Sequence, residues 1–339
     1  MHARSLVVFS IVAACHQHTA PDGASTGGAG LPLVTVADVP LPGGATRFDY
    51  QDLDAATGEF VVAHMNDNSV LILDLRDGSV EKQLTGIPTP RGVVIAPEVG
   101  LIFVTSMPSK LVLIDSTLLM ETARVATGTG PDGVAWDPAD KIVGVSDQGD
   151  GALSLIANAG SGTRTQVSLG NETGNVVYDP TRGAFWITVV TSAPRDQLVE
   201  VDPTTGTILN RIGLPGCSGA HGLRLHPDGA SAFVACEQND RLARVALGGA
   251  HEVTTAATGA DPDVLSIDRE LGWIYVAAES GDVTVFDVSR PGLALVGHDH
   301  PGANAHTVAV DPATHRVFFP LPSDPNGTPV LRIMRPSGS

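Results

Sequence analysis

The chain has 339 residues, a formal net charge of −17 and only 17% charged side chains. So acidic a chain repels polyphosphate, and no basic patch with interleaved aromatic residues occurs, so we expect no nucleic-acid partner. Glycine and proline are abundant, with 38 and 24 residues, which favours many short strands joined by tight turns over long helices.

Residues 1–14 are predicted to be a secretory signal peptide. The short basic start Met1–Arg4 precedes the apolar run SLVVFSIVAA at residues 5–14. That run is shorter than the roughly 20 residues of a transmembrane helix, and it ends in small residues, as secretory signals do. Residues 12–15, VAAC, resemble the lipobox of bacterial lipoproteins, which implies cleavage before Cys15 and attachment of lipid to this cysteine. A plain secretory signal with an incidental cysteine is the alternative.

Residues 15–31 are predicted to be a flexible tether. They are rich in Gly, Ser, Thr and Ala and cannot bury enough apolar surface to fold. Together with the signal, the tether predicts a protein of the bacterial cell envelope, anchored to a membrane through lipid on Cys15 and facing the periplasm or the cell surface.

A repeat runs through residues 32–336. In each copy an apolar, alternating segment ends at residue 54, 96, 137, 179, 226, 268 or 311, so that the steps are 42, 41, 42, 47, 42 and 43 residues. Most of these positions are Asp, and most are followed by Pro or a related turn residue. A period near 42 residues is typical of the four-stranded blade of a β-propeller. The sequence therefore predicts an all-β, seven-bladed β-propeller with four-stranded blades.

Each copy continues in the same order. A turn is followed by a β-rich second strand such as FVVAH at 60–64, a third such as SVLILDL at 69–75, and a more polar fourth that suits the outer edge. The last copy has no fourth strand, whereas the strand-like segment LVTVADVPLP at 33–42 precedes the first copy. We therefore expect this N-terminal strand to complete the last blade and close the ring, which removes its open edges.

The predicted second strands carry the segments FVVA at 60–63, FVTS at 103–106, FVAC at 233–236 and YVAA at 275–278. With these segments the chain resembles the YVTN-repeat, surface-layer-like propellers over residues 32–336, although the Asn of the family's tetrad is absent from these copies. The resemblance implies a single seven-bladed domain. It implies no particular activity, because the family is functionally mixed.

The first strand of each blade lines the central channel of a propeller, so the residues that open these strands form a ring around one channel mouth. In chain order they are Asp49, Arg91, Asp132, Gly174, His221, Asp263 and His306. The loops between second and third strands face the same mouth and add His64, Asp67, Asp147, Glu237 and Glu279. We predict that a ligand binds here to Asp49, His64, Arg91, Asp132, Asp147, His221, Glu237, Asp263, Glu279 and His306.

The function we favour for this ring is binding without catalysis, of a small molecule, a peptide or a protein, by a monomeric chain. Alternating Asp, Arg and His side chains around a funnel suit a polar or cationic ligand. The structural alternative is that the charges only pair with one another, with Arg91 neutralising Asp49 and Asp132.

A metal-dependent lactonase or other hydrolase is the enzymatic alternative. Asp132 and Asp263 each follow a proline and resemble the ligands of gluconolactonase-type metal propellers, which implies a divalent cation such as Ca²⁺. His221 or His306 would then activate water as the general base, since imidazole titrates near neutral pH. The Glu that those enzymes place in their first blade is not identifiable here.

Two further cysteines fall in the fifth copy. Cys217 lies in the loop before the first strand, and Cys236 ends the second strand at the same face. In an exported protein such a pair is expected to form a disulfide. A soft-metal site made of Cys217, His221 and Cys236 is the alternative.

Overall fold

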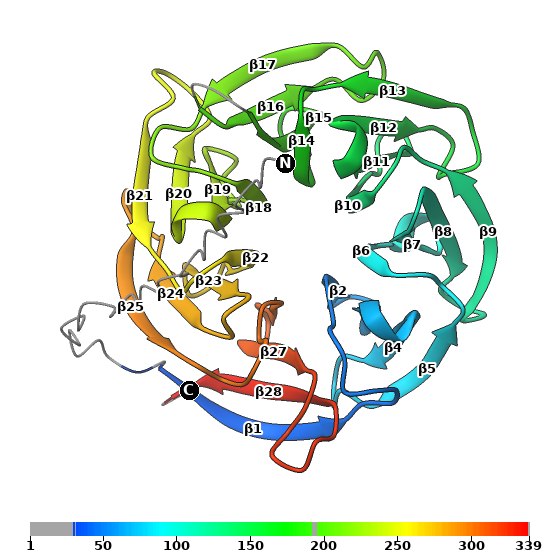
Figure 1. Cartoon of the computed structure of the whole chain (residues 1–339), viewed down its shortest axis with the longest axis vertical. Coiled ribbons are helices and arrows are strands. Elements are labelled where there is room, and N and C mark those ends of the chain that lie inside the picture. Colours follow the sequence, from blue (N-terminus) through cyan, green and yellow to red (C-terminus); the bar gives the residue numbers. More distant parts are fainter. Residues whose placement is uncertain (1–29, 31, 192–194, 338–339) are drawn as a thin grey trace, which may run out of the picture.

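The computed structural model describes residue 30, residues 32–191 and residues 195–337. These residues form seven four-stranded antiparallel sheets arranged in a ring, the seven-bladed β-propeller that the repeat predicts (Figure 1). The predicted signal peptide, Cys15 and all of the predicted tether except residue 30 lie outside the described residues. No described helix is long and apolar enough to cross a membrane.

Six blades are continuous in sequence, and each runs from its first strand at the channel to its fourth at the rim (Figure 1). Blades 1 to 3 are β2 (Gln51–Asp54), β3 (Glu59–His64), β4 (Ser69–Asp74) and β5 (Val80–Thr85); β6 (Pro90–Ala96), β7 (Leu101–Ser106), β8 (Lys110–Asp115) and β9 (Met120–Ala126); β10 (Pro131–Asp137), β11 (Ile142–Asp147), β12 (Ala152–Ile156) and β13 (Arg164–Ser168). Blades 4 to 6 are β14 (Glu172–Asp179), β15 (Ala184–Val190), β16 (Gln197–Val201) and β17 (Ile208–Gly213); β18 (Ala220–Leu225), β19 (Ser231–Cys236), β20 (Arg241–Ala246) and β21 (Val253–Ala257); β22 (Pro262–Asp268), β23 (Trp273–Ala278), β24 (Val283–Asp287) and β25 (Ala294–Asp299).

The seventh blade is assembled from both ends of the propeller. Its strands are β26 (Ala309–Asp311), β27 (Arg316–Leu321), β28 (Val330–Pro336) and, outermost, β1 (Leu33–Pro40). β1 pairs antiparallel with β28, with Leu33 opposite Pro336 and Pro40 opposite Val330. An ion pair between Arg332 and Asp38 joins the two strands at 2.6 Å. The predicted ring closure by the N-terminal strand is therefore confirmed (Figure 1).

The aspartates that close the first strands build the turns that follow them. One carboxylate oxygen of Asp137 accepts a hydrogen bond from the backbone N–H of Ala139 at 2.9 Å, and Asp179 does the same for Thr181. Such Asx turns satisfy backbone donors and reverse the chain into the second strand. The repeated Asp therefore serves the fold and is not a sign of chemistry.

The apolar core lies between blades. One buried cluster joins Trp186 and Leu198 of blade 4 to Ala232 and Val234 of blade 5, and Trp186 is fully buried there. Each sheet thus buries its face against a neighbouring sheet, as twisted propeller blades do. No blade buries its faces by itself, which explains why the ring must close.

Glycines let the first strands of neighbouring blades approach closely near the mouth. A Cβ atom on Gly222 of β18 would lie 1.7 Å from the carbonyl oxygen of Asp263, and one on Gly92 of β6 would lie 2.3 Å from that of Asp132. Hydroxyl groups of second strands also join neighbouring blades. Between blades 4 and 5, Thr188 Oγ1 donates to the carbonyl oxygen of His221 at 2.6 Å. These backbone contacts set the positions from which the ring side chains project.

Candidate functional site

A polar cavity of about 260 Å³ lies at the channel mouth where the first strands begin. It is lined by Arg47, Asp49, Met65, Arg91, Asp132, Gln148, His221, Glu237, Asp263 and Glu279. Because the lining residues come from different blades, the cavity exists only in the closed ring. The structure therefore brings together Asp49, Arg91, Asp132, His221, Glu237, Asp263 and Glu279, all of which the sequence analysis singled out.

His221 lies at the centre of three carboxylates. Its Nε2 is 3.2 Å from Asp132 Oδ2, and its Nδ1 is 2.9 Å from Glu237 Oε1 and 3.2 Å from Asp263 Oδ1. Burial lowers the pKa of His221, but these contacts outweigh burial and raise it well above its ordinary value. The surroundings therefore favour the charged form of His221, which faces carboxylates at both ring nitrogens.

Two arginines partly balance the acidic lining. Arg91 Nη1 lies 3.1 Å from Asp132 Oδ1 and donates to Gln148 Oε1 at 2.9 Å. Arg47 pairs with Glu279 and lies 3.6 Å from Asp263 Oδ2. The structural alternative is that Arg91 neutralises both Asp49 and Asp132. Among the described residues Arg91 forms an ion pair with Asp132 and none with Asp49.

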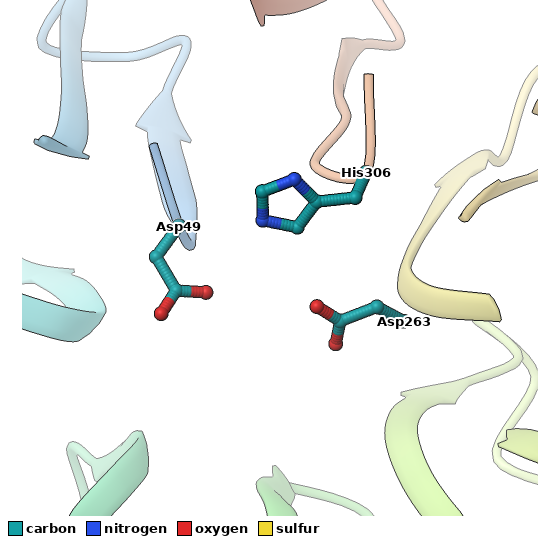
Figure 2. Close-up of side chains that lie close together, drawn as sticks. All are labelled: Asp49, Asp263 and His306. Atoms are coloured by element: carbon teal, nitrogen blue, oxygen red, sulfur yellow. The ribbon is translucent and has the colours of Figure 1, made fainter. Parts of the chain in front are cut away.

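Asp49 and His306 face each other, and each leaves polar atoms unpaired among the described residues. Within the described residues the Asp49 side chain makes no hydrogen bond or ion pair, although the residue is only 3% exposed. His306 is fully buried; its Nδ1 lies 3.2 Å from the carbonyl oxygen of Asn304, and its Nε2 has no partner. Figure 2 shows both side chains, with that of Asp263, directed toward one another.

Three predicted residues are not among those that line the cavity, namely His306, described above, His64 and Asp147. His64 stacks on Phe48 with ring centroids 4.0 Å apart, and its Nε2 lies 3.1 Å from Thr46 Oγ1. The Asp147 carboxylate accepts hydrogen bonds from Gly128 N at 2.9 Å and Ser154 Oγ at 2.5 Å. Burial raises the pKa of Asp147 to about 6, despite these bonds. Both side chains serve the packing of their own blades.

The residues that follow His64 and Asp147 in the sequence line the cavity instead. Met65 and Gln148 come directly after His64 and Asp147, and both line the cavity, as do Glu237 and Glu279, which follow the last residues of β19 and β23. Sequence analysis missed Met65, Gln148 and Arg47. Alignment of the seven copies on the end of the second strand identifies the first two, whereas Arg47 has no counterpart in the other copies.

The opposite mouth of the channel is chemically different. There a cavity of about 620 Å³ is lined mainly by apolar residues from all seven first strands, together with Asp52, Arg224 and Arg269. Burial raises the pKa of Asp52 to about 6, although its carboxylate accepts a hydrogen bond from Ile95 N at 2.9 Å. The two mouths therefore favour different ligands.

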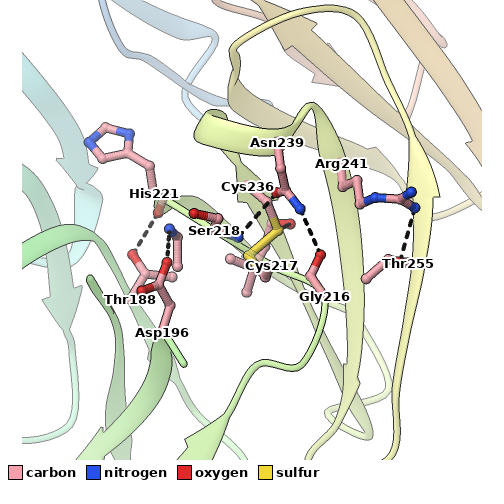
Figure 3. Close-up of a disulfide and its surroundings, with 12 residues drawn as sticks. Thr188, Asp196, Gly216, Cys217, Ser218, His221, Cys236, Asn239, Arg241 and Thr255 are labelled. Carbon is pink, nitrogen blue, oxygen red and sulfur yellow. Dashed lines mark hydrogen bonds between the residues drawn. A yellow bond between two sulfur atoms is a disulfide. The ribbon is translucent and has the colours of Figure 1, made fainter. Parts of the chain in front are cut away.

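The predicted disulfide between Cys217 and Cys236 is present, with Cα atoms 5.2 Å apart (Figure 3). It holds the loop before β18 against the end of β19, next to His221. Both sulfur atoms are used in the bond, so a soft-metal site made of the two cysteines and His221 is wrong for this oxidised state.

We expect the double substitution Cys217→Ser and Cys236→Ser to lower the free energy of unfolding by about 3 kcal/mol, because the bond closes a loop of 19 residues. Urea denaturation of both proteins measures the difference. Wild-type protein in reducing agent should match the variant, and the variant should not respond to reductant. Equal denaturation midpoints for wild type and variant would contradict the expectation.

No family model and no curated protein matches the chain. A solved structure of hydrazine synthase from Kuenenia stuttgartiensis is similar, with a TM-score of 0.73, 15% sequence identity, and coverage of 88% of this chain and 97% of that chain. Virginiamycin B lyase from Staphylococcus aureus has a TM-score of 0.69 at 13% identity, with coverage of 89% and 98%. At these identities the similarity shows the seven-bladed propeller fold alone.

Proposed function

We propose that this propeller is a binding protein that takes a small, positively charged ligand into its acidic channel mouth. The observation that carries the proposal is a pair of buried side chains that face each other with polar atoms left unpaired among the described residues: the carboxylate of Asp49, which lines the mouth, and Nε2 of His306. Burying polar groups unsatisfied costs free energy, so a ligand that supplies their missing contacts gains affinity.

The charge of the lining supports a cation. Five carboxylates line the cavity against two arginines and the imidazolium of His221, which leaves an excess of negative charge. Burial, followed by the nearby carboxylates of Asp132 and Asp263, raises the pKa of Asp49 well above its ordinary value. A bound cation relieves this repulsion, whereas an anion increases it.

Of the two general bases proposed for the lactonase or hydrolase alternative, His221 is chemically unsuited to the role. A general base must carry a free lone pair, and His221 is engaged at both nitrogens by carboxylates. His306 keeps a free Nε2, and burial lowers its pKa. Catalysis in this mouth would therefore depend on His306.

We also propose that the protein is a monomer held at a bacterial membrane surface by lipid on Cys15, with the propeller in the periplasm or at the cell surface. The VAAC segment at residues 12–15 supports the anchor. The Cys217–Cys236 disulfide supports an oxidising compartment. Metabolic labelling with palmitate, lost in Cys15→Ala, tests the anchor independently of the ligand.

The ligand proposal is tested by calorimetric titration of chelator-treated protein with Mg²⁺, Mn²⁺, Zn²⁺, tetramethylammonium, glucose and citrate. We expect at least one cation to bind, neither glucose nor citrate to bind, and Asp49→Asn to weaken cation binding at least tenfold. Asp52→Asn, which alters an acid at the opposite mouth, is the matched control and should bind as wild type does. Binding of citrate, or cation binding that Asp49→Asn leaves unchanged, would overturn the proposal.

A further inference from the structure

The acidic mouth contains a set of side chains arranged as metal ligands. One oxygen from Asp49, one oxygen from Asp263 and a ring nitrogen of His306 all lie within 4.8 Å of one another. The three residues come from blades 1, 6 and 7, and each is at least nine-tenths buried. Figure 2 shows their polar atoms converging on one point between the strands.

The imidazole of His306 is held in the state that a metal needs. Its Nδ1 lies 3.2 Å from the carbonyl oxygen of Asn304, which has no proton to give, so Nδ1 carries the hydrogen. The proton-free Nε2 is buried and has no hydrogen-bond partner in the part of the chain that the structure describes. Donation by the second ring nitrogen to a backbone carbonyl is how metal-ligating histidines are oriented.

We infer that Asp49, Asp263 and His306 form a binding site for one divalent transition-metal ion, with further coordination positions open to the cavity. The inference rests on the proposed function and names its ligand class. Two carboxylates and a neutral imidazole supply a charge of −2, which a divalent ion neutralises. An imidazole ligand favours Zn²⁺ or Mn²⁺ over Ca²⁺, which prefers oxygen alone.

A second group of possible ligands, His221, Glu237 and Asp263, lies beside the first. His221 offers no lone pair, because carboxylates contact both of its nitrogens. Asp132, one of the two metal ligands expected from the sequence, pairs with Arg91 at 3.1 Å and with His221 at 3.2 Å and belongs to neither group of possible ligands. Asp49 therefore replaces Asp132 in the inferred site, and Asp263 is common to both.

The two carboxylate ligands of the inferred site differ in how firmly neighbouring residues hold them. Asp263 contacts His221 through Oδ1 and lies 3.6 Å from Arg47 through Oδ2, so it is oriented before any ion binds. Asp49 has no such partner and is the ligand free to adjust. Asp49→Asn is therefore the substitution that weakens metal binding with least disturbance of the surrounding ion pairs.

The test is calorimetric titration of the chelator-treated full chain with Zn²⁺ and with Mn²⁺, together with elemental analysis after dialysis. We expect one ion per chain, and at least tenfold weaker binding in Asp49→Asn and in His306→Gln. Asp52→Asn, at the opposite mouth, is the matched control and should bind as wild type does. Glu237→Gln removes a carboxylate of the second group and should weaken binding less than Asp49→Asn does. Melting curves recorded in chelator verify that each variant is folded.

Each outcome decides the inference. Loss of binding in Glu237→Gln with retention in Asp49→Asn would place the ion in the second group and overturn the inferred site. If Zn²⁺ and Mn²⁺ do not bind but Mg²⁺ or tetramethylammonium does, the inference fails while the proposed cation-binding function stands. If no cation binds, both fail.

Discussion

A chain that begins at residue 41, and so lacks β1, should not form a stable monomeric propeller. β1 covers the outer edge of β28, and Ala37 and Val39 pack against the cluster that contains Leu331 and Ile333. Without it, β28 exposes unpaired N–H and C=O groups, which invite pairing with other chains. We expect the loss of a large part of the roughly 5–15 kcal/mol that keeps a domain folded.

Size-exclusion chromatography and urea denaturation measure this effect. The matched control is a chain that begins at residue 30, which keeps β1 and should behave as the full protein does. A synthetic peptide of residues 30–40, added to the shortened chain, should restore the monomer by supplying the missing strand. A shortened chain that is monomeric and denatures at the same urea concentration as the control would show that β1 is dispensable.

The second large effect is expected for Gly222→Ala in β18. The new Cβ would lie 1.7 Å from the carbonyl oxygen of Asp263, so the first strands of blades 5 and 6 must separate. Overpacking of this severity should cost about 4 kcal/mol or more. Because the displaced backbone belongs to Asp263, cation binding should fall together with stability.

Gly248→Ala is the control for this substitution. Gly248 is exposed and has no atom within 4 Å of its would-be Cβ, so the same chemical change should leave the protein within about 0.5 kcal/mol of wild type. Denaturation curves of the two variants make the comparison. Equal stabilities would show that the two strands have room to move apart.

The architecture was predictable from the sequence because a propeller repeats one local pattern. The aspartates that end the first strands recur for a physical reason, since each builds the turn into the next strand, and their spacing marks the blades. The residues that open the first strands were identified by the same alignment. This is why the sequence alone places Asp49, Asp132, His221 and Asp263 at one mouth.

The direction in which individual side chains point was harder to predict from the sequence than the architecture. Successive residues of a strand point to opposite sides, so an error of one position moves a side chain from the channel to the packed interior. His64 and Asp147 end their strands and pack within the blades, whereas Met65 and Gln148 face the cavity. Arg47 lies two residues before the position that opens the first strand, where no other copy has an arginine, so no repeat indicates its contact with Glu279.

Pairing within the mouth also depends on distances that a sequence does not contain. Asp132 and Asp49 occupy equivalent positions in their repeats, yet only Asp132 is bound by Arg91 and His221. The sequence predicts Asp132 as a metal ligand. Because of that difference, and because Nε2 of His306 has no partner among the described residues, the inferred site contains Asp49 in its place.

The hydroxyl bridges between neighbouring first strands bear on how such a protein can change over evolution. Thr188 holds the backbone at His221, and Thr105 holds the backbone at Asp132 through a 2.6 Å hydrogen bond. Neither bridge uses the side chain that reaches the mouth, so these side chains can be exchanged while the frame stays in place. A mutation in one blade alters only the side chain that this blade contributes to the mouth. New ligand preferences can therefore be acquired one blade at a time.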